Sequence, residues 1–328
     1  MSAPILAGLA QAALQRYPAE LRGTCSLLCL SENATFRIDA AGGRRYVLRV
    51  HRSGYHDRNQ IASELAWLDA LQADGLEVPH ARPGLDGERI QEIAGHSPEP
   101  RFAVLFDWIE GAQPDPERSL DAAFARLGAI NARLHNQARR WARPAGFDRK
   151  HWTHRSMLGE GAYWGRWEDA PYLDPEGRAL IVRTLAALAP ALAEYDRLPG
   201  RHGLIHADLR LANLLVEGEH TRVIDFDDCG FSWYLHDLAA ALSFYEHHPD
   251  ADHWIAHWLD GYAREASLDA ADLAALPSLI MQRRLQLLAW VGSHQGTEQA
   301  DSLGEPWVRQ TLALCSRYLD GRGVGSRT

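Results

Sequence analysis

The sequence predicts an α+β fold in which a small antiparallel sheet with one main helix precedes a larger, mostly helical region. Short runs of strand-forming residues gather in the first third of the 328-residue chain. Apolar residues at helical spacing dominate the rest. A turn-rich segment, Ala-Gln-Pro-Asp-Pro, separates the two parts at residues 112–116. We therefore expect one lobe of residues 1–106, a hinge of residues 107–112 and a second lobe of residues 113–328.

The first lobe is expected to open with a helix that ends near Pro18. The apolar residues on one side of this helix are Leu6, Leu9, Ala13 and Tyr17. Three strand-like runs follow, at residues 25–30, 34–39 and 45–50. The second and third runs are joined by Ala-Ala-Gly-Gly, and such a short connection predicts a hairpin.

A second helix is expected at residues 57–73, where apolar residues form one stripe. The stripe consists of Ile61, Leu65, Leu68 and Leu71. Glu64 falls within this stripe, and an unpaired carboxylate facing a core is very costly. Its nearest candidate partner is Arg49 on the preceding strand. The alternative is that Glu64 lies at the edge of the stripe and bends out to solvent.

The second lobe is expected to be mostly helical. A strand at residues 102–106 leads into the hinge. Helical periodicity then covers residues 120–136, 175–196, 235–246, 251–266, 279–291 and 306–319.

Composition restricts the classes of function. The formal net charge is -9 and there is no basic tract, which argues against nucleic acid as the main partner. No stretch approaches the roughly 20 apolar residues that cross a bilayer, and the first residues do not resemble a secretion signal. We therefore expect a cytoplasmic protein without a membrane partner. The cysteines form no zinc-binding pattern and are expected to be reduced thiols: Cys25, Cys29, Cys229 and Cys315.

The most informative segment is residues 203–228, GLIHADLRLANLLVEGEHTRVIDFDD. His206, Asp208 and Asn213 form the pattern H-x-D-x-x-x-x-N. Two apolar runs follow, at residues 214–216 and 223–226, and the polar residues between them predict a hairpin. Asp225 lies inside the second run, where alternation alone would not place a carboxylate.

Phosphoryl transfer explains why these residue types occur together. Magnesium prefers hard oxygen ligands, which Asp225 and the amide of Asn213 supply. Asp208 is a separate carboxylate that can orient an acceptor hydroxyl and take its proton. His206 is expected to belong to the catalytic loop and to brace it by hydrogen bonding. The alternative is a polar turn in which Asp and Asn residues serve only as caps.

This segment resembles the superfamily of aminoglycoside phosphotransferases, choline kinases and homoserine kinases, the phosphotransferase enzyme family, whose members are distant relatives of protein kinases. The resemblance extends over most of the chain. It implies a bilobal protein-kinase-like fold with ATP and Mg²⁺ as cofactors. Residues 31–36 resemble the family's turn over the nucleotide phosphates, so Ser31 and Asn33 are expected to contact the nucleotide.

The resemblance also assigns roles outside the catalytic segment. Residues 46–50 resemble the third strand, whose cation Arg49 would pair with Glu64 and help to bind the nucleotide. Residues 106–109 resemble the hinge that binds adenine, which implicates Asp107 and Ile109. By the same analogy, Asp237 braces the catalytic loop and does not touch substrate.

Three features depart from the family's usual pattern. Arg49 stands where protein kinases have lysine, and its planar fork differs from a point charge. Ala207 stands where glycine is commoner, which suits a negative φ, whereas a positive φ would strain the residue. Leu211 and Ala212 stand where the family often has proline and glycine. None of these changes removes a chemical group that the mechanism needs.

Other clusters are open to two interpretations. The tryptophans of the second lobe either line an acceptor pocket or pack in the core: Trp152, Trp164, Trp167, Trp233, Trp254 and Trp258. Three acidic residues, Asp227, Asp228 and Glu246, either form an anionic rim suited to an amine-bearing acceptor or are solvated, and Asp227 could instead join the metal ligands. His253 and His257 share one helical face but have no H-E-x-x-H pattern, so packing or a surface position is favoured.

The expected function is transfer of the γ-phosphoryl group of ATP to a hydroxyl of a small molecule, such as an amino alcohol, a hydroxy amino acid or an aminoglycoside-like compound. A second interpretation is a bacterial stress-response Ser/Thr protein kinase. The stretch between Asp225 and Asp237 is short for an activation segment and favours a small acceptor. A third is a nucleotide-binding pseudokinase, which the presence of Asp208, Asn213 and Asp225 opposes.

Overall fold

The computed structural model describes residues 3–30, 33–93, 100–115, 118–218 and 220–326. The chain forms two compact units. The sheet unit comprises residues 1–112, 142–149 and 215–227, and the helical unit comprises residues 113–141, 150–214 and 228–328. The expected boundary at residues 107–112 is therefore one of several boundaries between the units. Residues 142–149 and 215–227, which were expected in the second lobe, belong to the sheet unit.

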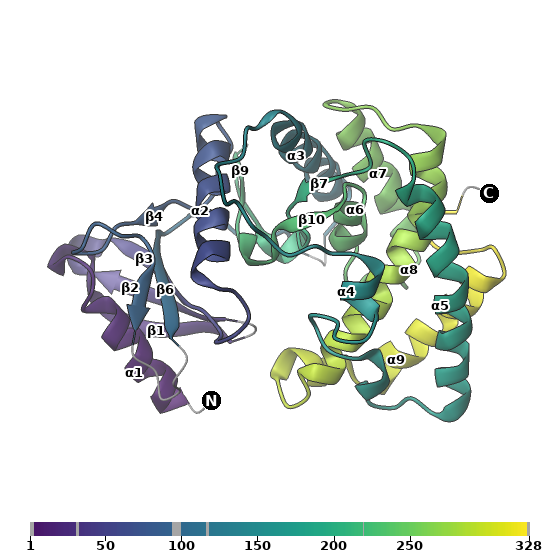
Figure 1. Ribbon diagram of the computed structural model, residues 1–328, viewed down its shortest axis with the longest axis horizontal. Helices are drawn as coiled ribbons and strands as arrows, with labels where there is room; N and C mark the ends of the chain where they lie inside the picture. Colours follow the sequence, from purple (N-terminus) through teal and green to yellow (C-terminus); the bar gives the residue numbers. More distant parts are fainter. Residues whose placement is uncertain (1–2, 31–32, 94–99, 116–117, 219, 327–328) are drawn as a thin grey trace. The chain divides into compact units, whose positions relative to one another are not determined.

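The sheet unit is built on six antiparallel strands (Figure 1). The strands are β1 (Gly23–Leu30), β2 (Ala34–Ala40), β3 (Arg45–Val50), β4 (Ala81–Arg82), β5 (Gln91–Ile93) and β6 (Arg101–Asp107). Their order is β1-β2-β3-β6-β4, and β5 also pairs with β6. The predicted hairpin is confirmed, since β2 and β3 pair from Ala34 opposite Val50 to Asp39 opposite Arg45.

Two helices complete this unit. Helix α1 (Ala3–Leu14) packs on the sheet, and its Leu6 and Leu9 share a core with Phe36 and Leu48. Helix α2 (Arg58–Ala73) begins where the Asp57 carboxylate accepts a hydrogen bond from the backbone of the first turn, which satisfies one of the free N–H groups at a helix start. The predicted apolar stripe of α2 is buried.

The segment that carries Asp225 also packs in the sheet unit. Strands β8 (Leu214–Glu217) and β9 (His220–Val223) pair in a small sheet. Val216 bridges to Ala112, and the Val223 N–H donates to the Glu77 carbonyl at 3.1 Å. These bonds explain why residues 215–227 belong to this unit.

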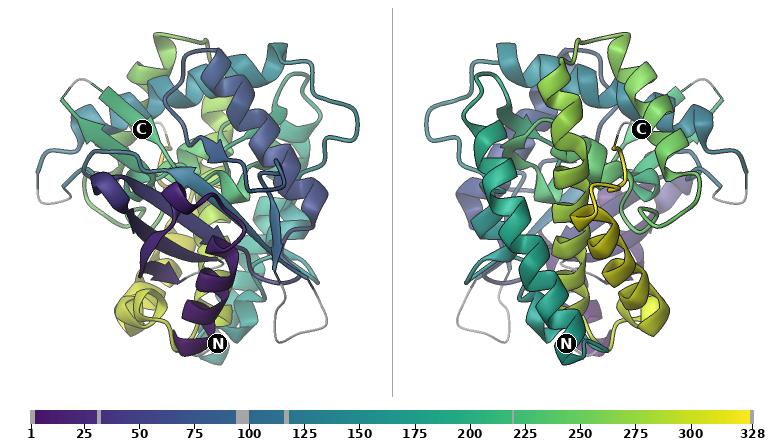
Figure 2. Two further views of the ribbon diagram at one scale, coloured as in Figure 1. Left: turned by 90° about the vertical axis from the view of Figure 1, so that its left-hand side faces the viewer. Right: turned by 90° about the vertical axis from the view of Figure 1, so that its right-hand side faces the viewer.

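The helical unit contains seven α-helices among the described residues: α3 (Asp121–Arg140), α4 (His154–Leu158), α5 (Pro175–Asp196), α6 (His236–Ala241), α7 (Ala251–Ala263), α8 (Ala270–Ser293) and α9 (Glu298–Leu319). The long helices α5, α8 and α9 pack together (Figure 2). Strands β7 (His202–Ile205) and β10 (Gly230–Trp233) form an antiparallel pair that the sequence patterns did not predict.

Helix α8 begins well before the predicted residue 279. Asp269 and Asp272 form a reciprocal capping box at its start, which stabilises a helix end by satisfying backbone donors. The apolar residues that follow are buried, so the helix continues through Pro277. Capping and packing therefore outweigh the local cost of a proline inside the helix.

Helices α3 and α7 approach each other closely at two glycines. A Cβ atom at Gly128 would lie 1.9 Å from the Trp258 carbonyl oxygen, and one at Gly261 would lie 1.9 Å from the Ala125 carbonyl oxygen. Any larger residue at either position would force the helices apart. In the described part of the chain, no helix has both the length and the apolar character needed to cross a membrane.

Candidate active site

The H-x-D-x-x-x-x-N segment forms the loop that follows β7 in the helical unit. The Arg283 guanidinium donates to Asp208 Oδ1 at 2.5 Å, and Arg210 Nε donates to Oδ2 at 3.3 Å. The amide nitrogen of Asn213 donates to the Asp208 carbonyl at 2.8 Å and to Oδ2 at 3.2 Å. The loop therefore presents one carboxylate held by two guanidinium groups and an amide.

These contacts keep Asp208 in its charged form. Burial opposes ionisation of the carboxyl group, but the positive charges of Arg210 and Arg283 outweigh it and lower the pKa of Asp208 below its usual value. At neutral pH the group is thus a hydrogen-bond acceptor, as required to orient a hydroxyl.

Arg283 is a residue that the sequence patterns missed. It lies on α8, and its side chain is only 1% exposed. Its Nε donates to the Ser243 hydroxyl, and its Nη1 donates to the Gln286 side chain and the Ala207 carbonyl. It is 75 residues from Asp208 in the chain, so no local pattern could reveal the pair. We regard Arg283 as a positioning residue, because it acts through Asp208.

A buried hydrogen-bond network anchors the catalytic loop. Asp237 accepts from the N–H groups of His206 at 3.2 Å and Ala207 at 2.7 Å. His135 Nε2 lies 3.0 Å from Asp237, and its Nδ1 lies 3.0 Å from the Tyr262 hydroxyl. The expected bracing role of Asp237 is present, and α3 and α7 extend it through His135 and Tyr262.

His206 supports the loop from inside. Its Nδ1 accepts a hydrogen bond from the Asp208 N–H at 3.3 Å, and its side chain is buried. This position suits a residue that braces the loop, as expected from the sequence.

The structure shows which backbone conformation Ala207 adopts where the family more commonly has glycine. Its φ is +68°, so this alanine occupies a conformation that suits glycine better. The hydrogen bond from its N–H to Asp237 holds the peptide in place. Local strain of this kind is characteristic of functional loops.

Ala207→Gly is therefore expected to be tolerated. Glycine costs about 1 kcal/mol relative to alanine in a helix, whereas an L-residue in the left-handed region costs about 1–2 kcal/mol. The two effects should roughly cancel at residue 207, and kcat should be unchanged. Ala239→Gly in α6 is the matched control, with an expected loss of about 1 kcal/mol. Urea unfolding measures both; an equal loss in the two variants would contradict the assignment of strain.

A buried ion pair organises the sheet unit. Arg49 Nη2 lies 2.5 Å from Glu64 Oε1, with side chains 7% and 1% exposed. Arg49 Nη1 lies 3.5 Å from Asp227 Oδ1. Burial opposes the charge on Arg49, but the carboxylates of Glu64 and Asp227 raise its pKa. The predicted inward position of Glu64 and its pairing with Arg49 are confirmed.

Asp225 follows the end of a strand. Strand β9 ends at Val223, so Asp225 lies just beyond it, although its neighbours in the sequence are apolar. Its φ is +66°, and its side chain is 50% exposed. Arg49 Nη1 lies 4.0 Å away. The strained turn holds this carboxylate out of the sheet and within reach of solvent.

Asp225 and Asn213, each in its own unit, carry oxygen donors of the kind that magnesium prefers. Within the described residues, the amide nitrogen of Asn213 is occupied by Asp208, while its amide oxygen accepts no hydrogen bond. A half-exposed carboxylate and a free amide oxygen are the hard ligands that this ion prefers. Unlike the half-exposed carboxylate of Asp225, the carboxylate of Asp227 is buried. Its Oδ1 lies 3.4 Å from His51 Nδ1, and its Oδ2 lies 3.6 Å from His56 Nε2.

The predicted nucleotide-contacting residues lie in the sheet unit, except that Ser31 lies outside the described residues. Asn33 is buried, and its side chain accepts a hydrogen bond from the Arg52 N–H at 3.1 Å. The carboxylate of Asp107 binds Arg82 Nε at 2.7 Å. The backbone of Ile109 makes no hydrogen bond with the described residues, so it remains available to a base.

The tryptophans of the second lobe and Glu246 have structural explanations. All six tryptophans considered above are buried, which supports packing. Glu246 is not on an anionic rim: it lies inside the helical unit, where it pairs with Arg284 at 2.6 Å and both side chains are 0% exposed.

This fold and these residues define the class of the protein: it is a phosphotransferase with an alcohol group as acceptor. Residues 30–276 match the model of the Phosphotransferase enzyme family, and the chain belongs to that family. It is an ATP-dependent enzyme that acts on a hydroxyl group of a small molecule.

Individual relatives agree with this membership. A solved microcompartment-associated aminopropanol kinase is 43% identical, with a TM-score of 0.88, over 97% of this chain and 99% of that one. A homoserine kinase of Pseudomonas aeruginosa is 32% identical over 219 residues, which are 65% of this chain and 61% of the relative. An amicoumacin kinase in complex with AMP-PNP and Ca²⁺ is 19% identical, with a TM-score of 0.73 over 92% of this chain and 91% of that one, and shows the shared fold.

Proposed function

We propose that this enzyme transfers the γ-phosphoryl group of ATP to the hydroxyl of a small amino alcohol, with Mg²⁺ as the cofactor. The observation that carries the proposal is the ionised Asp208, which is held by Arg283 and Asn213 in the catalytic loop. The likeness to an aminopropanol kinase over nearly the whole chain supports the choice of an amino alcohol.

In the proposed reaction, Asp208 accepts a hydrogen bond from the acceptor hydroxyl and takes its proton. The hydroxyl oxygen forms a bond to the γ-phosphorus as the bond to the β–γ bridging oxygen breaks, and ADP leaves. Arg283 keeps Asp208 oriented, and it keeps the carboxylate charged until the carboxylate takes the proton. When bound, Mg²⁺ neutralises charge on the phosphates, and Asn213 and Asp225 would hold it.

The sheet unit supplies the nucleotide contacts in this proposal. Arg49 binds phosphate, and Glu64 fixes the guanidinium from behind. Ser31 and Asn33 belong to the turn over the phosphates. The hinge binds adenine through backbone groups near Asp107 and Ile109.

The contacts of Arg283 favour an amino alcohol over a hydroxy amino acid. A hydroxy amino acid carries a carboxylate, which a buried cation near the catalytic aspartate could bind. Arg283 is buried, and each of its three nitrogens donates to the protein: to Asp208, to Ser243, and to Gln286 and Ala207. It is therefore committed to the protein and poorly placed to bind a substrate carboxylate.

A coupled ADP-release screen tests the acceptor. We expect kcat/KM to be highest for short amino alcohols such as aminopropanol and ethanolamine, and lower for homoserine and aminoglycosides. Generic protein substrates and an autophosphorylation assay belong in the same screen. A preference for homoserine would overturn the assignment of an amino alcohol as the acceptor. Phosphorylation of protein substrates alone would overturn the assignment of any small molecule as the acceptor.

A further inference from the structure

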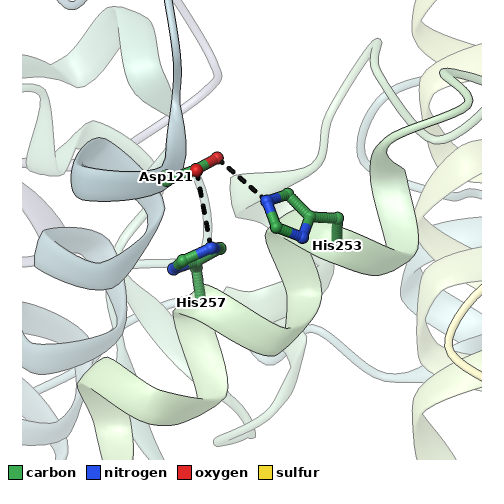
Figure 3. A group of neighbouring side chains, drawn as sticks. All are labelled: Asp121, His253 and His257. Carbon is green, nitrogen blue, oxygen red and sulfur yellow. Dashed lines mark ion pairs between the residues drawn. The ribbon is translucent and has the colours of Figure 1, made fainter.

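A cluster of metal-ligating side chains lies on the helical unit and takes no part in the mechanism above. Asp121 is the first residue of α3, and His253 and His257 lie one turn apart on α7 (Figure 3). Nε2 of His253 lies 3.2 Å from Asp121 Oδ1, and Nε2 of His257 lies 3.6 Å from Oδ2. One ligand atom from each residue lies within 4.8 Å of the others.

We propose that Asp121, His253 and His257 bind a zinc-class divalent ion that links α3 to α7. Two imidazoles and one carboxylate form a donor set that suits Zn²⁺ and Co²⁺ better than Mg²⁺. With bonds of about 2.0–2.2 Å, neighbouring ligands of a tetrahedral zinc ion are separated by about 3.3–3.6 Å. The separations of His253 from Oδ1 and of His257 from Oδ2, 3.2 and 3.6 Å, lie close to this range. Water would complete the coordination shell.

The packing beside the cluster holds the ligands in place before an ion arrives. The ring of Phe124, one turn after Asp121, stacks on Trp254 next to His253, with centroids 5.3 Å apart and ring planes at 4°. The close glycine contacts at Gly128 and Gly261 fix the same two helices farther along. Preorganisation of this kind reduces the entropy that binding must overcome.

Solvent can reach the cluster. The side chains of His253, Asp121 and His257 are 57%, 39% and 32% exposed. All three ligand groups are therefore accessible to a cation in solution.

The ion would stabilise the helices that support the catalytic loop. Helix α3 carries His135 and α7 carries Tyr262, which bond to each other beneath the loop. A metal link between α3 and α7 would oppose their separation. The role is structural, so phosphoryl transfer with Mg²⁺ does not depend on it.

Cobalt absorption tests this site in the full-length protein. Titration with Co²⁺ in excess Mg²⁺, which fills hard-oxygen sites, should give intense visible bands from one tetrahedral ion, and Zn²⁺ should displace it. Asp121→Asn, His253→Gln and His257→Gln should each weaken Co²⁺ binding at least about tenfold, since loss of even an outer-shell partner can cost that much. His248→Gln is the matched control, because His248 is an exposed histidine that stacks on Trp254 outside the cluster.

Thermal unfolding provides the second measurement. Zn²⁺ should raise the Tm of the wild-type protein and of the His248 variant, but not that of the three cluster variants. All variants should retain kinase turnover with Mg²⁺. Absence of tetrahedral Co²⁺ bands in the wild type, or equal binding by wild type and the cluster variants, would show only a histidine–carboxylate ion pair and overturn the proposal.

Discussion

Asp208→Asn is expected to lower kcat by about 10²–10⁴-fold, the usual contribution of a positioned general base. Asparagine has nearly the same shape, but its amide cannot take a proton. It also leaves the buried Arg283 without its charged partner, and breaking a buried pair by removing one member typically costs about 3–5 kcal/mol. A single-turnover assay of ADP formation measures the chemical step.

Two measurements separate lost chemistry from lost folding in this variant. ATP binding should be largely retained by the folded protein, and urea unfolding reports the change in stability. Asp196→Asn provides the matched control, since this aspartate is 50% exposed and pairs only with His202 among the described residues. Wild-type turnover by the Asp208 variant would contradict its assignment as the base.

Asp225→Ala is expected to weaken the magnesium-dependent part of nucleotide binding by at least about tenfold, because the loss of even an outer-shell partner of a metal costs about 10–100-fold. Binding of nucleotide without magnesium should change much less. Calorimetric titration of ATP with and without Mg²⁺ measures the difference. The side chain is half-exposed, so folding should tolerate its removal.

A control for this variant exists in the same unit. Asp39→Asn changes a partly exposed aspartate that pairs with Arg37 on the same strand. The control should bind Mg²⁺ and ATP as the wild type does. An Asp225 variant with an unchanged magnesium dependence would exclude this residue as a ligand.

Together these experiments separate the acceptor side of the mechanism from the nucleotide and metal side. The Asp208 variant tests proton transfer and acceptor orientation, whereas the Asp225 variant tests the metal. Arg49 and Glu64 define a third element, a buried pair that also approaches the Asp225 segment, since Arg49 Nη1 lies 4.0 Å from Asp225 and 3.5 Å from Asp227. The substitution of arginine for the lysine of protein kinases keeps the positive charge and adds a fork that can bind both Glu64 and a phosphate.

Much of this organisation was predictable because it is local. Hydrophobic periodicity located the main strands and helices, and the spacing from His206 to Asn213 located the catalytic loop. The inward Glu64 was predicted because a charged residue within an apolar stripe requires a partner. Boundaries were less predictable: Pro277 lies inside α8, and β9 ends before Asp225.

The sequence by itself determined the family and the reaction class and proposed the residues that carry the chemistry, since these depend on residue types at short spacings. Only the tertiary structure decided that Arg283 holds Asp208, and that His135 and Tyr262 extend the support of Asp237. It also decided that Ala207 has a positive φ and that Glu246 is inside the helical unit. These facts depend on contacts between segments that are distant in the sequence. Local patterns do not distinguish one possible partner from another, and packing and charge pairing in the folded protein determine which partner is used.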